Sequence, residues 1–159
     1  CLTGDTVVNT VFGGRKIKDL VGKFGFVWSY DEKRKKKCIR PFFGVKKTRE
    51  NQPILKITLE NGKTVRCTPD HRILTDNGWV EAKYLTQSSK IIDINCSNLV
   101  SVEKMECEPN EDVYNMEVIG THNFSVNGGV IVHNCMDDIR YFVNTVLKNK
   151  QKKAYISIM

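Results

Sequence analysis

The sequence of 159 residues predicts an all-β fold, and three observations support this expectation. Short runs of β-branched and aromatic residues recur through residues 1–132, separated by turn-forming residues at short intervals. The dipeptide Asn-Gly at 61–62 and at 77–78 stands between such runs, and it is the strongest short-range signal of a β-hairpin. The periodicity of an amphipathic helix is confined to the last part of the chain. Many short strands with little helix favour a closed or horseshoe-shaped sheet.

The expected elements are bounded by turn signals. Strands are expected at residues 6–12, 24–30, 54–59, 64–67, 71–74, 79–80, 90–94, 99–105, 113–119, 123–126 and 130–132. Gly13-Gly14 ends the first strand, and Asn61-Gly62 and Asn77-Gly78 each close a hairpin. Residues 81–85 are expected to form one helical turn. The polar, turn-prone stretch 95–110 is the expected place of an insertion.

The composition changes at Cys135. Asp137 and Asp138 precede apolar residues that are spaced three and four positions apart, as in an amphipathic helix. These apolar residues are Ile139, Phe142, Val143, Val146 and Leu147. The two aspartates suit the positive N-terminus of such a helix, and a solvated basic stretch follows at 148–153. The sequence therefore predicts a domain of residues 1–134 and a short α-helical flank of residues 135–159.

The charge of the domain depends on one basic run. Residues 1–134 hold 20 Lys or Arg and 16 Asp or Glu, and five of the basic residues are consecutive at positions 33–37. Without that run the domain has 15 basic and 16 acidic residues, so its charge is balanced. The run is either a solvated loop or a contact for a polyanion. An apolar fraction of 40% is ordinary for a globular domain, and no run approaches the roughly 18 apolar residues of a membrane span.

The six cysteines contain no CxxC pair, which disfavours a zinc ribbon or a thioredoxin-like site. The first residues lack the basic flank and apolar stretch of a signal peptide, so a disulfide framework is not expected either. Cys38, Cys67, Cys96 and Cys107 are expected to be small buried residues. Because no Met precedes Cys1, we expect this residue to be internal to a longer precursor or to follow a processing step.

The end of the domain carries its clearest chemical signal, the tripeptide His133-Asn134-Cys135. The side-chain amide of an asparagine can attack the asparagine's own backbone carbonyl, which closes a succinimide and releases the amine of the next residue. This reaction is intramolecular, so geometry meets much of its entropic cost in advance. A neighbouring imidazole can protonate the departing amine or polarise the carbonyl. Together with Cys1, the thiol of Cys135 indicates acyl transfer between distant positions that the fold brings together.

Four sequence blocks resemble those of inteins, the self-splicing protein insertions. CLTGDTVV, which begins at Cys1, resembles their opening block, and VRCTPDHRIL resembles the second block, with a Thr and a His separated by two residues. VYNMEVIGTHNFSVNGGVIVHNC resembles the two closing blocks. The blocks occur in the expected order, without the long insertion that would hold a homing endonuclease. Residues 1–134 therefore resemble a mini-intein, which implies the horseshoe-like Hedgehog/intein (Hint) fold.

The resemblance implies catalytic roles for three residues at the first junction. Cys1 would attack the preceding carbonyl and convert an amide into a thioester, which is a better acyl donor. His71 would move the thiol proton and protonate the departing amine. Thr68 would donate a hydrogen bond to the developing oxyanion. This chemistry requires no cofactor and no metal, because acyl donor and nucleophile are both groups of the protein.

At the second junction the resemblance implies that Cys135 takes over the acyl group by thioester exchange. Asn134 would then cyclise with help from His133 and His122, and a sulfur-to-nitrogen shift would complete the joined product. The implied activity is single-turnover self-processing. One position departs from the pattern, because Asn115 stands where the third block usually has an aspartate after its Tyr. An amide cannot ionise, so we expect Asn115 to modulate the rate or the order of the steps.

Simpler readings exist for each block taken alone. His71 follows Pro69-Asp70 and could be a turn histidine, Thr68 could be an ordinary strand residue, and His122 could satisfy backbone groups in a loop. Two other functions also remain open. One is a Hedgehog-type autoprocessing domain, which needs no Asn-Cys junction. The other is a non-catalytic basic β-domain that binds nucleic acid through residues 33–37.

The flank has a resemblance of its own. CMDDIRYFV resembles the end of the nuclease region in the large subunit of phage terminases, which implies Asp137 as a metal ligand in the spliced host protein. The implied partners are the chain's own flanking exteins, with nucleic acid bound only through the spliced host and with no membrane. We expect a monomer in the cytoplasm of a bacterium or a phage-infected cell.

Overall fold

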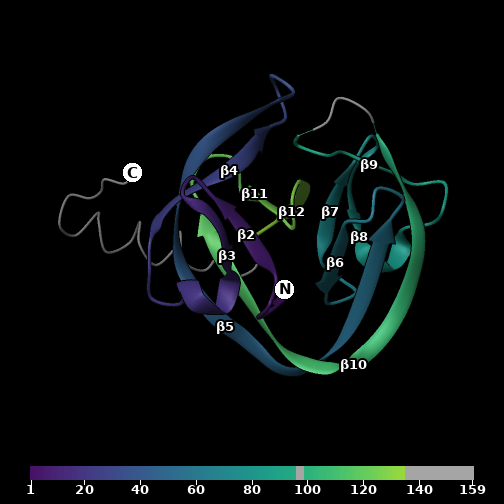
Figure 1. Cartoon of the computed structure of the whole chain (residues 1–159), viewed down its shortest axis with the longest axis horizontal. Helices are drawn as coiled ribbons and strands as arrows, with labels where there is room; N and C mark the ends of the chain where they lie inside the picture. Colours follow the sequence, from purple (N-terminus) through teal and green to yellow (C-terminus); the bar gives the residue numbers. More distant parts are fainter. Residues whose placement is uncertain (96–98, 135–159) are drawn as a thin grey trace, which may run out of the picture.

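The computed structural model describes residues 1–95 and 99–134, whose elements are labelled in Figure 1. The strands are β1 (Leu2–Thr3), β2 (Val7–Thr10), β3 (Gly13–Lys16), β4 (Gly25–Asp31), β5 (Lys36–Leu59), β6 (Thr64–Cys67), β7 (Arg72–Thr75), β8 (Gly78–Glu81), β9 (Lys90–Ile91), β10 (Val100–Val118), β11 (Asn123–Val126) and β12 (Val130–His133). Two 3-10 helices accompany them, η1 (Ile17–Leu20) and η2 (Ala82–Tyr84). The described residues hold no α-helix, so the predicted all-β fold is confirmed. No helix in this part of the chain is long and apolar enough to cross a membrane. The α-helix predicted for residues 135–159 lies outside the described residues.

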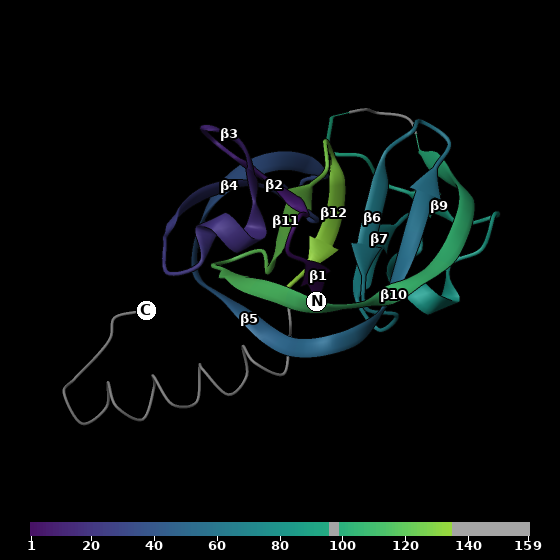
Figure 2. The ribbon, with the colours of Figure 1, turned by 60° about the horizontal axis from the view of Figure 1, so that its bottom comes forward.

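The strands form one sheet that closes on itself. Its order is β11-β12-β7-β9-β10-β1-β6-β5-β4-β2-β3, with β8 paired to β7. A further pairing of Val126 in β11 with Val8 in β2 brings the two ends of this order together. In Figure 1, the strands β2, β3, β4 and β11 lie on one side and β6 to β9 on the other. The N-terminus and β12 lie between these two groups in both ribbon views, so the start of the chain and the last described strand lie near the middle of the closed sheet (Figures 1 and 2).

Two long strands connect the two groups. β5 and β10 pair antiparallel from Val102 opposite Leu59 to Val118 opposite Phe42, and they curve around the outer side of the molecule (Figure 2). Five register shifts interrupt this pairing. Such bulges bend a two-stranded ribbon and increase its twist. The ribbon thereby gives the sheet the predicted horseshoe shape.

Residues 100–110, which were expected to be turn-prone, belong to β10; this confirms the strand predicted at 99–105 and extends it, while an insertion in this stretch stays a prediction. The middle of β10 has few buried side chains, so its sequence lacks the alternation of apolar and polar residues that marks a half-buried strand. Residues 36–53 belong to β5 and were not predicted as strand either; Phe42 and Val45 are the buried residues among them, and the others are exposed or half-buried. The exposed middle of this ribbon therefore lacks the alternating pattern that predicts a strand, and its sequence resembles that of a loop.

Both predicted Asn-Gly hairpins are confirmed. They join β5 to β6 and β7 to β8, and their glycines, Gly62 and Gly78, have φ angles of 87° and 98°. Glycine adopts such positive φ angles without the steric cost that a Cβ atom would add. The helical turn predicted at 81–85 is present as η2.

The prediction that four cysteines are buried is confirmed for Cys67 only. Cys38 is half-buried, and Cys107 is exposed because it lies in the uncovered middle of β10. Cys96 lies outside the described residues. Burial in the core therefore does not explain the cysteines at positions 38 and 107.

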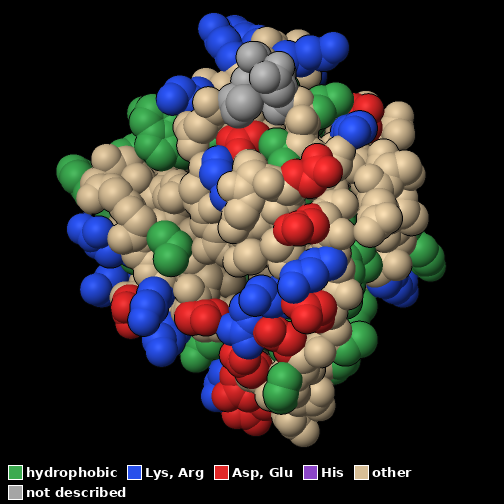
Figure 3. Space-filling model, turned by 45° about the vertical axis from the view of Figure 1, so that its right-hand side comes forward, with side chains coloured by type: hydrophobic (Ala, Val, Ile, Leu, Met, Phe, Trp, Pro, Cys, Tyr) green, Lys and Arg blue, Asp and Glu red, His purple; other side chains and the backbone are tan. Residues whose placement is uncertain are grey.

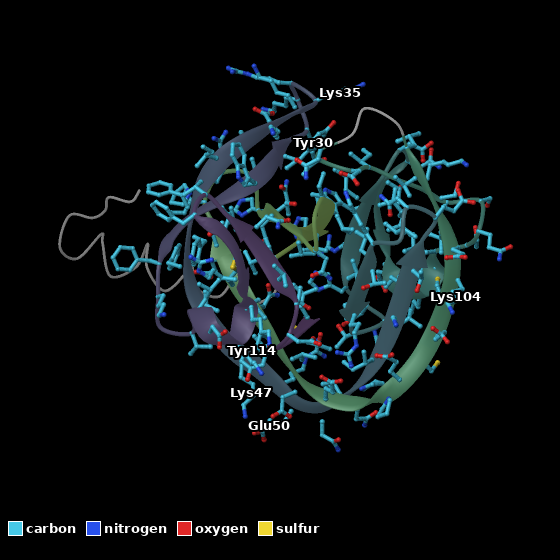
Figure 4. All side chains as sticks on the ribbon, in the orientation of Figure 1. Tyr30, Lys35, Lys47, Glu50, Lys104 and Tyr114 are labelled. Atoms are coloured by element: carbon cyan, nitrogen blue, oxygen red, sulfur yellow. The ribbon has the colours of Figure 1, made fainter. Side chains whose placement is uncertain are left out.

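The basic run at residues 33–37 forms the turn between β4 and β5 and the start of β5, and all five residues are exposed. Lys35 lies at the tip of this hairpin and points away from the body of the molecule (Figure 4). Lys37 Nζ lies 4.9 Å from the centre of the Trp28 ring. On the lower half of the face in Figure 3, Lys and Arg side chains lie among Asp and Glu side chains. The position of the run fits the solvated loop that was one of its two readings.

Candidate active site

Cys1 lies in the interior because the next residue is anchored in the sheet. Leu2 is fully buried and pairs with Cys67 in β6 and Tyr114 in β10. The Thr68 backbone N–H donates to the Cys1 carbonyl oxygen over 2.9 Å. Only 4% of the Cys1 surface is exposed, so the residue lies in a protected environment.

His71 contacts the nitrogen of Cys1. It occupies the turn that follows Thr68, where its backbone N–H donates to the Thr68 carbonyl over 3.1 Å. The Cys1 nitrogen donates to His71 Nδ1, and His71 Nε2 is buried with no hydrogen-bond partner among the described residues. Burial lowers the pKa of His71 well below its usual value of 6.5, and the positive Cys1 amine and the nearby His133 lower it further. His71 is thus a turn histidine, as its simpler reading held, that also faces the first junction.

Thr68 is held by an ionic group that the sequence did not reveal. Its hydroxyl accepts a hydrogen bond from the Cys1 nitrogen over 3.1 Å and donates to Asp70 Oδ1 over 2.7 Å. Asp70 Oδ2 lies 3.7 Å from a guanidinium nitrogen of Arg49. Burial would raise the pKa of Asp70, but the Thr68 hydroxyl, the Cys1 amine and Arg49 together lower it. The carboxylate therefore fixes the direction in which the Thr68 hydroxyl points.

The sulfur of Cys1 faces two donors from β5. Thr48 Oγ1 lies 3.1 Å from Sγ, and a guanidinium nitrogen of Arg49 lies 3.6 Å from it. Donors and positive charge near a sulfur favour the thiolate, which is the nucleophilic form. The neighbouring Cys67 contrasts with this, because burial raises the pKa of its thiol to about 12. Of these two thiols in the interior, only Cys1 has surroundings suited to a nucleophile.

Asn134 is held by backbone groups. Its backbone N–H donates to the His122 carbonyl over 3.0 Å. With the side-chain amide oriented so that both ends are satisfied, Nδ2 donates to the same carbonyl over 2.8 Å and Oδ1 accepts from the Val118 N–H over 3.0 Å. His122 itself has a φ of 58°, and its Nδ1 is buried without a hydrogen-bond partner in the described part of the chain. The contribution of His122 to this geometry comes from its backbone.

His133 places its imidazole on the carbonyl of Asn134, with Nδ1 2.6 Å from the oxygen. The edge of one ring meets the face of the other between His133 and Trp79, with ring centres 4.8 Å apart and planes at 89°. Burial lowers the pKa of His133, and Arg72 and His122 lower it further, while the Asn134 carbonyl and Glu32 oppose them. The imidazole can therefore act on the carbonyl at which Asn134 would cyclise.

The two junctions share the seam between β7 and β12. Val132 pairs with Ile73, so the end of β12 lies beside the start of β7, next to His71. The effect of His133 on the pKa of His71 shows the same closeness. The structure thus brings the predicted described residues into two adjoining groups. These are Cys1, Thr68 and His71, and His122, His133 and Asn134. Cys135 and Asp137 lie outside the described residues, and the terminase-like reading of the flank stays a prediction.

Asn115 is buried beside Lys46 in the paired β5–β10 ribbon. Its Oδ1 accepts from the Met116 backbone N–H over 2.8 Å, and its Nδ2 has no partner among the described residues. Sequence reasoning missed Thr48, Arg49 and Trp79, because their partners lie far away in the chain. Within residues 1–95 and 99–134, no three His, Cys, Asp or Glu side chains gather as a metal-binding group.

Comparisons with known proteins agree on one family. The model of the Pretoxin HINT domain matches residues 7–135. A DnaB intein from Synechocystis sp. PCC 6803 is 25% identical with a TM-score of 0.79, and the match covers 84% of this chain and 97% of that one. The DnaX mini intein from Spirulina platensis is 31% identical with a TM-score of 0.71, over 84% of this chain and 98% of that one.

Among curated sequences, the replicative DNA helicase DnaB of Nostoc sp. is 37% identical over 87 residues, which are 50% of this chain and 9% of that protein. The ribonucleoside-diphosphate reductase large subunit of Invertebrate iridescent virus 6 is 29% identical over 109 residues, 69% of this chain and 10% of that protein. The chain thus spans about a tenth of the length of these relatives. Since the family model covers most of the described residues, the chain belongs to the Pretoxin HINT domain family and has the fold of the mini-inteins.

Proposed function

We propose that this chain is a protein-splicing element that excises residues 1–134 and joins its two flanking segments. The similarity to inteins of known structure supports self-processing in general. The observation that carries the finer proposal is that one imidazole contacts each junction. His71 Nδ1 meets the nitrogen of Cys1, and His133 Nδ1 lies 2.6 Å from the carbonyl oxygen of Asn134.

In the first step, the Cys1 sulfur attacks the carbonyl carbon of the preceding residue. The C–S bond forms as the C–N bond breaks, and the thiol proton ends on the released amine. His71 can carry this proton because its Nδ1 already contacts the receiving nitrogen. In a precursor that nitrogen is an uncharged amide, so one of the charges that lower the pKa of His71 is missing. The amine that forms restores this charge, which favours release of the proton from His71.

The donors around the Cys1 sulfur assist the attack. Thr48 and Arg49 face Sγ and stabilise negative charge on it. Thr68 accepts from the Cys1 nitrogen and donates to Asp70, so in this arrangement its hydroxyl proton is already engaged. Its role is then to orient the nitrogen of the bond that breaks. Donation to an oxyanion, which the sequence predicted, would require the hydroxyl to leave Asp70.

In the later steps the acyl group moves from the Cys1 sulfur to the Cys135 sulfur. Asn134 Nδ2 then attacks its own carbonyl carbon, the bond to the Cys135 nitrogen breaks, and that nitrogen takes up the proton. His133 stabilises the charge that develops on the carbonyl oxygen. A final shift of the acyl group from the Cys135 sulfur to the free amine forms the new peptide bond. Every group in this sequence belongs to the chain or to its flanks.

The proposal is tested by preparing a precursor with a foreign segment before Cys1 and measuring the intact masses of its products. We expect the joined flanks and the free 1–134 segment. Cys1→Ala should remove thiol-inducible cleavage before Cys1, and Asn134→Ala should trap a thioester or branched species. Cys107→Ser is the matched control, because that cysteine is exposed. Full splicing in either junction variant would contradict the proposal.

The same precursor separates the other functions. Cleavage before Cys1 by an external nucleophile, with no break after Asn134, would indicate Hedgehog-type autoprocessing. An intact precursor that binds nucleic acid through residues 33–37 would indicate a non-catalytic domain.

A further inference from the structure

The imidazole of His133 depends on one aromatic neighbour for its orientation. His133 is the last residue of β12 and is only half-buried, so the sheet fixes its backbone and leaves its ring partly in solvent. The ring contact in the described residues is with Trp79, edge to face at 4.8 Å. Such a contact prefers a perpendicular arrangement, and the observed 89° is close to it.

Trp79 is itself held at two ends. Its backbone pairs with Leu74 across the β7–β8 hairpin. Its indole Nε1 donates to Glu32 Oε2 over 3.1 Å. Glu32 comes from the turn after β4, which belongs to the opposite group of strands. The indole is therefore held in place beside His133 by contacts from both groups of strands.

We propose that Trp79 is a positioning residue that sets the His133 ring on the Asn134 carbonyl, and that Glu32 anchors Trp79 for this purpose. The inference rests on the proposed splicing function and deepens it. The Trp79–Glu32 pair maintains the distance of 2.6 Å from His133 Nδ1 to the carbonyl oxygen of Asn134. Catalysis by a positioned group falls steeply with small displacements. Loss of the Trp79 side chain therefore slows the cyclisation of Asn134 selectively.

The charged groups that face His133 shift its pKa, and Glu32 is one of them. Arg72 at the start of β7 and His122 before β11 lower the pKa of His133, and His71 is close enough to interact with it. Glu32 acts in the opposite direction. The residue that holds the indole therefore also favours the imidazolium, in which Nδ1 always carries a proton and can donate to the carbonyl.

The first test compares rates at the two junctions. In the foreign-segment precursor, Trp79→Ala should slow cleavage after Asn134 by about tenfold to a hundredfold, the loss typical of a displaced catalytic group. Thiol-induced cleavage before Cys1 should keep its rate, which also shows that the variant folds. Trp79→Phe keeps a ring edge without the Nε1 donor and should recover part of the rate. Trp28→Ala is the matched control, because Trp28 is also half-buried and contacts Lys37 instead.

The second test measures the pKa of His133 by NMR titration of its imidazole in the chain itself. Glu32→Gln keeps an acceptor for the indole and removes the charge, so the pKa of His133 should fall and the pH profile of Asn134 cleavage should move to lower pH. Glu60→Gln, on an exposed residue elsewhere, should change neither. Equal losses at both junctions in Trp79→Ala, or an unchanged rate and pKa in all variants, would overturn the inference. If the parent precursor does not cleave at all, the proposed function fails, and the titration alone then decides whether Glu32 and Trp79 set the state of His133.

Discussion

The two junctions of the domain are built differently. The atoms of Cys1 are contacted by side chains from two parts of the chain, which are Thr48 and Arg49 in β5 and Thr68 and His71 after β6. The side chain of Asn134 is held instead by the backbone of His122 and Val118. In the proposed splicing reaction, the first junction must activate a nucleophile and move a proton, which requires groups that ionise. The second must hold an amide close to its own carbonyl, which backbone groups do well.

The two imidazoles differ in the same way. His71 is almost fully buried beside a positive amine, and its pKa is lowered well below 6.5. His133 is half-buried, and Glu32 opposes the lowering of its pKa. The pKa of both imidazoles is lowered, but more strongly for His71, which is therefore the better suited of the two to give up a proton. Variants that alter one junction at a time test this contrast.

The largest effect is expected from His71→Ala in the precursor. Loss of a positioned acid–base group typically costs about 10²–10⁴ in rate, and this loss should fall on thioester formation at Cys1. Cleavage after Asn134 should change much less. The measurement is the rate of thiol-induced cleavage before Cys1 against the rate of release after Asn134. Arg15→Ala, an exposed change in β3, serves as the control. A similar loss at both junctions would show that His71 serves them as one site.

His71 also gives the domain a predictable response to acid. Because the folded pKa of His71 lies below its unfolded value of 6.5, the unfolded chain binds the proton more tightly. The stability that this neutral imidazole contributes is present above pH 6.5 and is lost as the pH falls below it. His71→Gln should flatten this part of the profile in thermal melts between about pH 5 and 8. A slope that persists in His71→Gln would assign the acid response to other groups, of which His133 is the first to examine.

A smaller effect is expected from Asn115→Asp, which restores the aspartate usual in the resembled block. Asn115 is 3% exposed, so a carboxylate there loses most of its hydration and its pKa rises above the unfolded value. The variant should match the parent in acid and lose stability as the pH rises, by about 2–4 °C in melting temperature for each kcal/mol. The acidic group should also couple the two cleavage steps, which would appear as less release after Asn134 before thioester formation.

Asn115→Ala is the control for that change. It removes the buried Nδ2 that has no partner in the described residues, and it adds no charge. A melting temperature that depends on pH as strongly in Asn115→Ala as in Asn115→Asp would rule out the carboxylate as the cause.

Much of the fold could be predicted from the sequence, and so could some of the residues that meet at each junction. The Asn-Gly hairpins at Gly62 and Gly78 are local signals, because a glycine at positive φ determines the turn by itself. Cys1, His71 and Asn134 could be identified from their chemistry and block order. The exposed middle of the β5–β10 ribbon could not, because strands with few buried side chains lack an apolar face, whereas the parts of these strands at 54–59, 99–105 and 113–119 were predicted. Arg49 and Trp79 could not either, because their role depends on contacts between residues far apart in the chain.

The smallest effect is expected from neutralising the basic run at residues 33–37. The Arg34 side chain is 74% exposed and lies 4.0 Å from Asp31, and exposed pairs of this kind contribute about 0–1 kcal/mol. Changing Lys33, Arg34 and Lys35 together to Gln should therefore leave the melting temperature and the splicing yield nearly unchanged. Arg66→Ala is the contrasting control, because Arg66 joins carboxylates of β10 to the turn after β1 and its loss should lower the melting temperature clearly. The run directly follows Glu32, whose carboxylate holds Trp79 beside His133. If neutralising the run changes cleavage after Asn134 while cleavage before Cys1 is unaffected, the loop acts on the second junction through Glu32, and the contrast between the junctions extends to the tip of the hairpin.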